Sequence, residues 1–136
     1  MKIDIPDIKQ QQKAIFEEST KAAIKQLKEN LKAPVIESQS EIEESQYSNA
    51  HLLTESQGFE SPHPDIVGAY FRHFQQHFPE YGTDKRLSVL LGVNSDRRIR
   101  AFKDGSRKCP YGIWRKFLII TGRAPQEIIQ VKAFMA

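Results

Sequence analysis

The sequence has a single cysteine, Cys109, so it cannot form an intrachain disulfide, and with scattered histidines it lacks the paired ligands of a structural zinc site. No apolar run approaches the roughly 20 residues that cross a bilayer. The first residues, MKIDIPDIKQQQ, carry acids and glutamines where a signal peptide would be apolar. These absences predict a cytoplasmic protein without a membrane segment, a metal or another cofactor.

Recognisable catalytic signatures are also missing. The chain has no glycine-rich phosphate loop, no Ser/His/Asp or Cys/His arrangement of familiar spacing, and no carboxylate cluster in its second half. Glu41, Glu43 and Glu44 are close in sequence, but they lie in a stretch rich in Ser and Gln. We therefore expect a binding protein and not an enzyme.

Arginine is absent from the first 60 residues, which hold seven lysines and 11 acids. Residues 61–136 hold five lysines, all eight arginines and six acids, so the net charge of +3 divides into −4 and +7. A strongly basic half indicates a nucleic-acid partner, and a merely solvated basic surface is the alternative.

The chain of 136 residues is long enough for one compact domain and a tail. Residues 1–36 form an N-terminal amphipathic segment, in which a helix from about 10 to 32 carries Phe16, Ile24, Leu27 and Leu31 on one stripe. Residues 37–61 have the composition of an acidic Ser/Gln/Glu-rich linker or weakly helical connector. Residues 62–136 are predicted to form the domain.

The domain is expected to be all-α. Apolar residues recur at helical spacing after Pro64, and Thr83 caps a short helix that ends at Gly92. A third helix begins near Ser95, a fourth at Pro110 and a fifth at Pro125, the last burying Ile128 and Ile129. No stretch shows the alternation of a half-buried strand.

Residues 94–116 hold eight basic residues against two acids. On a helix that begins at Ser95, Ile99 and Phe102 turn inward, which leaves the polar side chains on the outer face or its flanks: Asp96, Arg97, Arg100 and Lys103. The guanidinium of arginine can bridge two acceptors, as phosphates and the edge of guanine require.

These segments resemble the lambda-repressor-like (Xre/Cro) helix-turn-helix family. The matching residues are TDKRLSVLLGVN, RRIRAFKDGSRKCP and YGIWRKFLIITG, within about 64–122. The resemblance implies a five-helix domain in which the helix after Ser95 enters the major groove. The family often has a contacting glutamine where this chain has Asp84, which would repel phosphate unless Lys85 or Arg86 compensates.

The resemblance also implies the DNA contacts. By the family's layout the residues nearest the base edges are Asp96, Arg97, Arg98 and Arg100. Those expected on phosphates are Lys85, Arg86, Lys103, Arg107 and Lys108.

Several features have two interpretations. His73 and His77 stand four residues apart, as a metal pair or an ordinary surface pair. Tyr111, Trp114 and Phe117 could stack on single-stranded bases, but their spacing is typical of a core. Cys109, beside a lysine, is either a redox-sensitive thiol or an incidental small residue.

The function expected from the sequence is that of a DNA-binding transcriptional regulator, nucleoid-associated, from a bacterium or a mobile element. It would bind double-stranded DNA as a homodimer, and Phe16, Ile24, Leu27 and Leu31 would pair two copies. That helix could instead dock on its own domain or recruit a protein partner. The alternatives for the whole chain are a non-enzymatic adaptor, and an accessory factor of conjugation, replication or recombination.

Overall fold

The structure, a computed structural model, describes residues 7–135. These residues contain five α-helices, four short 3-10 turns and no strand, so the all-α prediction is confirmed for the described chain. They divide into two compact units, one of residues 38–126 and one of the residues up to Glu37 together with those from Glu127 onward. Among the described helices, none is both long enough and apolar enough to cross a membrane.

The N-terminal helix α1 spans Ile8–Asn30, close to the predicted bounds. Asp7 begins it, because its carboxylate accepts the backbone N–H of Gln10 at 2.8 Å while the Gln10 side chain accepts the N–H of Asp7. The helix has no buried residue. The helix contacts the C-terminal segment of the same unit, where Phe134 lies edge-on to Phe16 with ring centroids 4.9 Å apart.

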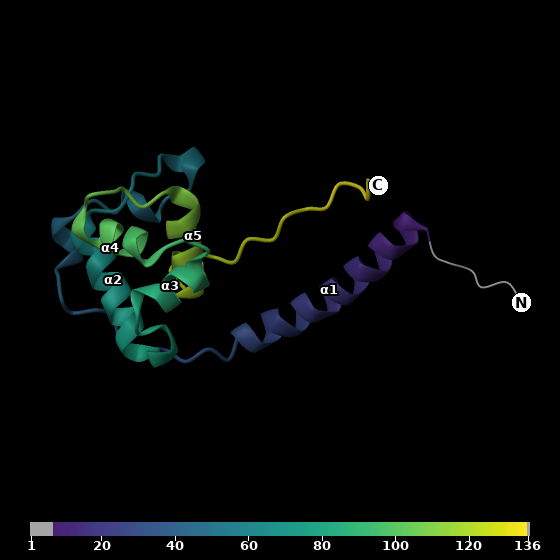
Figure 1. Ribbon diagram of the computed structural model, residues 1–136, viewed down its shortest axis with the longest axis horizontal. Helices are drawn as coiled ribbons and strands as arrows, with labels where there is room; N and C mark the ends of the chain where they lie inside the picture. The colour runs from purple at the N-terminus through teal and green to yellow at the C-terminus, as the bar shows by residue number, and fades with distance from the viewer. Residues whose placement is uncertain (1–6, 136) are drawn as a thin grey trace, which may run out of the picture. The chain divides into compact units, whose positions relative to one another are not determined.

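The larger unit contains the other four helices, packed together in Figure 1: α2 (Pro64–His77), α3 (Asp84–Leu91), α4 (Asp96–Asp104) and α5 (Tyr111–Ile120). Thr83 caps α3 by accepting the N–H of Arg86 at 3.2 Å. Gly92 and Gly105 end α3 and α4 in the left-handed conformation, with φ of 72° and 84°. The predicted bounds of these helices are confirmed within a few residues.

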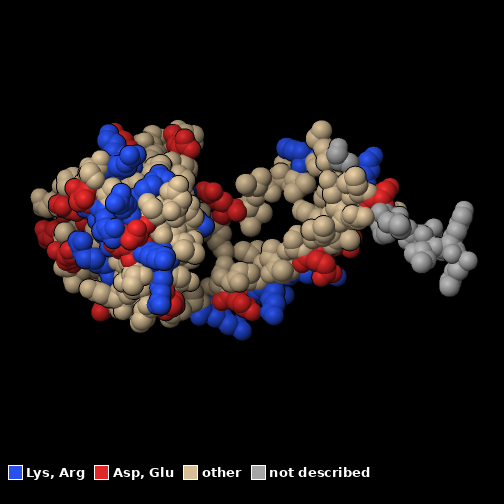
Figure 2. All heavy atoms as spheres, viewed as in Figure 1, with Lys and Arg blue, Asp and Glu red and all other residues tan. Residues whose placement is uncertain are grey.

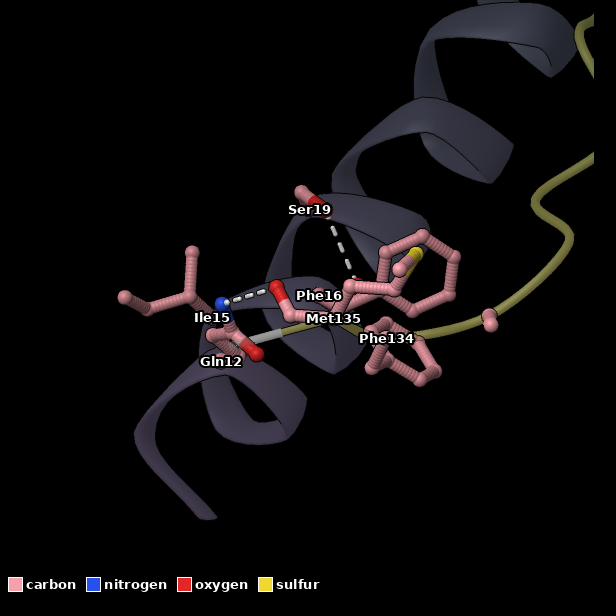
Figure 3. A pocket seen from close by; sticks show the side chains of 7 residues that line it. Gln12, Ile15, Phe16, Ser19, Phe134 and Met135 are labelled. Carbon is pink, nitrogen blue, oxygen red and sulfur yellow. Dashed lines mark hydrogen bonds between the residues drawn. The ribbon is translucent and has the colours of Figure 1, made fainter. Parts of the chain in front are cut away.

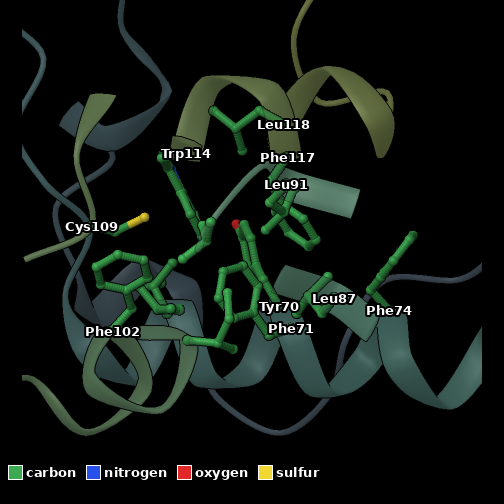
Figure 4. Packing of buried hydrophobic residues seen from close by; sticks show 14 of the residues in the cluster. Tyr70, Phe71, Phe74, Leu87, Leu91, Phe102, Cys109, Trp114, Phe117 and Leu118 are labelled. Carbon is green, nitrogen blue, oxygen red and sulfur yellow. The ribbon is translucent and has the colours of Figure 1, made fainter. Parts of the chain in front are cut away.

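Aromatic side chains fill the core between these helices (Figure 4). Trp114 of α5 is fully buried and stacks on Tyr70 of α2, with ring centroids 5.6 Å apart. Phe71 and Phe117 meet edge-on at 4.9 Å. Because Trp114 and Phe117 are buried, they cannot stack on bases, and their interpretation as core residues is confirmed.

The sequence suggested that residues 37–61 form a linker or a weakly helical connector. Residues 38–61 instead belong to the larger unit and contain three short 3-10 turns. His51 is buried, and its Nδ1 accepts the indole N–H of Trp114 at 3.1 Å. Burial lowers the pKa of His51 and outweighs the opposing charge of Glu44, so the ring is a neutral acceptor. Polar composition concealed this segment because it attaches through hydrogen bonds and through a few separated apolar side chains, Ile42, Tyr47 and Phe59, that form no continuous apolar face.

The same segment makes charged contacts with α2. Glu44 accepts a hydrogen bond from the Tyr70 hydroxyl, and Glu41 receives two from the guanidinium of Arg72, at 3.0 and 2.5 Å. Burial alone would raise the pKa of Glu44, but the hydrogen bonds from Tyr70 and Gln39 outweigh it and the pKa is lowered. Residues 38–61, called the strap below, therefore attach to α2 through an ionised carboxylate and hydrogen bonds.

The predicted fifth helix of the domain is wrong. Residues 125–135 are not helical, and Ile128 and Ile129 are 76% and 86% exposed. Gly122 ends α5 with φ of 71°, and Pro125 has no N–H to donate. Side chains from residues 38–61, namely Ile42, Tyr47 and Phe59, pack against the core instead.

Candidate nucleic-acid interface

The connection between α3 and α4 sets the direction of α4. Gly92 turns the chain, and the N–H of Val93 donates to the carbonyl of Ser88 at 2.8 Å. Val93 is itself buried in the core. The two short helices are thus joined by only four residues, 92–95, and they pack against each other.

Helix α4 has one apolar and one basic face, as the sequence predicted. Ile99 and Phe102 are buried at 0% and 1% exposure. Arg97 and Arg100 are exposed on the first two turns, whereas Arg98 is half-buried with its guanidinium 5.7 Å from the centroid of the Phe102 ring. The apolar face therefore fixes the helix while two guanidinium groups remain open to solvent.

Asp96 has a partner on the same helix. Its carboxylate accepts a hydrogen bond from Arg100 at 3.1 Å, and both side chains are about half exposed. An exposed pair of this kind contributes little to stability and separates readily. Arg100 therefore stays available to another acceptor.

Lys103 does not have the predicted role. Its ammonium lies 2.7 Å from Asp84 and 3.0 Å from the amide oxygen of Gln75, and its side chain is only 17% exposed. Burial alone would raise the pKa of Asp84, but hydrogen bonds from Lys103 and Gln75 outweigh it, and the pKa is lowered. Lys103 is therefore a brace between α2, α3 and α4, and not a free phosphate contact.

The same contact changes the interpretation of Asp84. The sequence suggested that Lys85 or Arg86 would compensate its charge, yet the nearest cation is that of Lys103 on α4. Lys85 and Arg86 are both exposed on the first turn of α3. They remain available for an anionic partner.

Two further exposed bases follow α4. Arg107 and Lys108 lie in the connection to α5, and the backbone N–H of Arg107 donates to the carbonyl of Ala101 at 3.2 Å, which holds the loop against the end of α4. Figure 2 shows lysine and arginine atoms gathered over α3 and α4, with acidic atoms between them. The open bases of this surface, called the α3–α4 surface below, are Lys85, Arg86, Arg97, Arg100, Arg107 and Lys108.

Three arginines of the basic half are structural. Arg115 is buried and donates to the carbonyl of Leu52 at 3.2 Å. Arg123 lies 3.9 Å from the centroid of the Tyr70 ring, and Arg72 pairs with Glu41. The net charge of the basic half includes these three arginines, but their partners belong to the strap of residues 38–61 or to the core. The open basic surface is smaller than the sequence suggested.

The remaining reactive groups do not form a second site in the described chain. His73 and His77 have ring centroids 4.6 Å apart, but among residues 7–135 no three His, Cys, Asp or Glu side chains could hold a metal ion. Cys109 is buried, which raises the pKa of its thiol to about 12. A redox-sensitive role for this thiol is therefore contradicted.

The four residues predicted for dimerisation lie on α1 or at its end, in the other unit. Phe16, Ile24 and Leu31 are 38%, 49% and 87% exposed, and Leu27 is half-buried.

No family model, curated protein or solved structure matches the chain.

Proposed function

We propose that residues 38–126 are a lambda-repressor-like helix-turn-helix domain that binds double-stranded DNA sequence-specifically, and that the protein is a nucleoid-associated transcriptional regulator. The observation that carries the proposal is the exposed pair Arg97 and Arg100 on the first turns of α4, opposite the buried Ile99 and Phe102. A short helix fixed on its apolar face, with open arginines at its beginning, suits the major groove.

The side chains divide into two groups by chemistry. Arg97 and Arg100 would read base edges through bidentate hydrogen bonds, with Arg98 beside them and Asp96 aligning Arg100. Lys85 and Arg86 on α3, and Arg107 and Lys108 in the connection after α4, would bind phosphates and set the register. Lys103 is absent from this set because Asp84 holds it.

We also propose that two copies bind together. Domains of this kind read half-sites about one helical turn, roughly 34 Å, apart, and a single copy contacts few bases. The stripe on α1 supports pairing of the two copies, since three of its four apolar residues, Phe16, Ile24 and Leu31, are exposed in the described structure.

The proposal is tested by selecting bound duplexes from a random DNA pool with the full chain. We expect one consensus with two symmetric half-sites. A consensus with a single half-site would support DNA binding by the domain but contradict binding as a dimer. A bound pool without sequence enrichment would reject sequence-specific recognition, and failure to retain DNA at all would favour an adaptor that binds protein.

A further inference from the structure

Helix α1 has an apolar stripe that its own unit covers only in part, since Phe16 contacts Phe134 and Leu27 is half-buried. Figure 3 shows Phe134 and Met135 lying against the first half of α1, beside Phe16. Farther along, Ile24 and Leu31 are 49% and 87% exposed. A helix of 23 residues with no buried side chain depends on packing against a partner for its stability.

The two flanks of the stripe differ in charge. At about 100° per residue, the side chains on either side of the line from Phe16 to Leu31 follow from the sequence. One flank is charged and consists of Glu17, Lys21 and Lys28. The other is uncharged and consists of Gln12, Ser19 and Gln26.

We propose that the stripe is covered by α1 of a second copy of this chain, running antiparallel. This arrangement rests on the homodimer proposed above and specifies its geometry. In an antiparallel pair each flank meets the same flank of the other helix, so the acid and the bases of the charged flank face each other. In a parallel pair each flank meets the opposite one, and Glu17 would lie beside uncharged side chains.

One register matches both the apolar stripe and the charges. With the two-fold axis between Ala23 and Ile24, Phe16 lies opposite Leu31 of the second copy and Thr20 lies opposite its Leu27. Ile24 then lies opposite Ala23 of the second copy, so the four stripe residues meet one another or the two small side chains, Thr20 and Ala23, that lie along the same line of the helix. The same register brings Glu17 near Lys28 of the second copy, twice in each dimer, by symmetry.

Charge reversal tests this pairing, with sedimentation equilibrium of the full chain, without DNA, as the measurement. Glu17→Lys and Lys28→Glu should each weaken the dimer about tenfold, because two attractive pairs become repulsive. The double variant E17K/K28E should restore the affinity to within about threefold of the original. Positions 17 and 28 are about 16 Å apart along one helix, so this rescue cannot come from within a chain.

Glu18→Lys is the matched control, because it makes the same change of charge on the side of α1 away from the stripe, where Glu18 pairs with Lys21 at 3.6 Å. It should leave the dimer unchanged. Single reversals without effect, or a double variant weaker than either single one, would overturn the antiparallel register. A wild-type chain that stays monomeric throughout a micromolar series would overturn the pairing itself.

This result is separable from the proposed DNA binding. None of the three substituted residues belongs to the α3–α4 surface, and the measurement contains no DNA. Rescue by E17K/K28E in a protein that fails to enrich any DNA sequence would uphold the pairing and reject the regulator. A sequence-specific monomer would do the reverse.

Discussion

Replacing Trp114 by Ala is expected to lower the free energy of unfolding by about 3–5 kcal/mol, the cost of removing a fully buried aromatic side chain. Trp114 is 0% exposed and contacts the rings of Tyr70, Phe71 and Phe117. Urea denaturation of the full chain, followed by circular dichroism, measures the change. Lys116→Ala, at an exposed position of the same helix, is the control and should change the free energy by less than about 0.5 kcal/mol.

His51→Ala extends this prediction to the strap. It leaves the indole N–H of Trp114 buried without its acceptor, which costs about 1–3 kcal/mol. In the double variant with Trp114→Ala the two effects should not add, since both remove the same hydrogen bond. A neutral His51→Ala variant would mean that residues 38–61 are the loose linker that their composition suggested.

The second large effect is expected in DNA binding. Replacing both Arg97 and Arg100 by Ala should reduce affinity for the selected sequence at least about 30-fold, from about 1–3 kcal/mol for each base contact. Both side chains are exposed on α4, so the fold should be unaffected. Fluorescence anisotropy with the selected and a scrambled duplex measures the loss.

Lys108→Ala is the matched control for the arginine pair. It removes an exposed positive charge outside α4 and should weaken both duplexes alike, because a phosphate contact carries no sequence information. Equal losses on the two duplexes for the Arg97 and Arg100 variant would contradict the division into base and phosphate contacts.

Local signals made the four helices of the larger unit predictable. Pro64 and Thr83 mark helix beginnings, and Gly92 and Gly105 mark ends, so the bounds follow from capping and backbone preferences alone. The three-residue step from Ile99 to Phe102 likewise determined which face of α4 is buried. Capping and backbone preferences involve only a few neighbouring residues, so they can be recognised in the sequence alone.

The contacts that sequence reasoning missed join distant residues. His51 and Trp114 are 63 residues apart, and Asp84 and Lys103 are 19 apart. A polar residue that packs through one hydrogen bond leaves no periodic pattern. The fifth helix was predicted from Pro125 as a helix start followed by the apolar Ile128 and Ile129, but both isoleucines are exposed, and such a local pattern does not show whether the side chains will be buried.

Binding of the full chain to the selected duplex over a series of salt concentrations is the sharpest test of the α3–α4 surface as a DNA interface. We expect the logarithm of the affinity to fall with the logarithm of salt concentration at a slope of about −3.6 for each bound domain, because four phosphates are contacted by Lys85, Arg86, Arg107 and Lys108. Lys108→Ala should reduce the slope by about 1. Absence of binding, or an affinity independent of salt, would contradict the α3–α4 surface as a DNA interface.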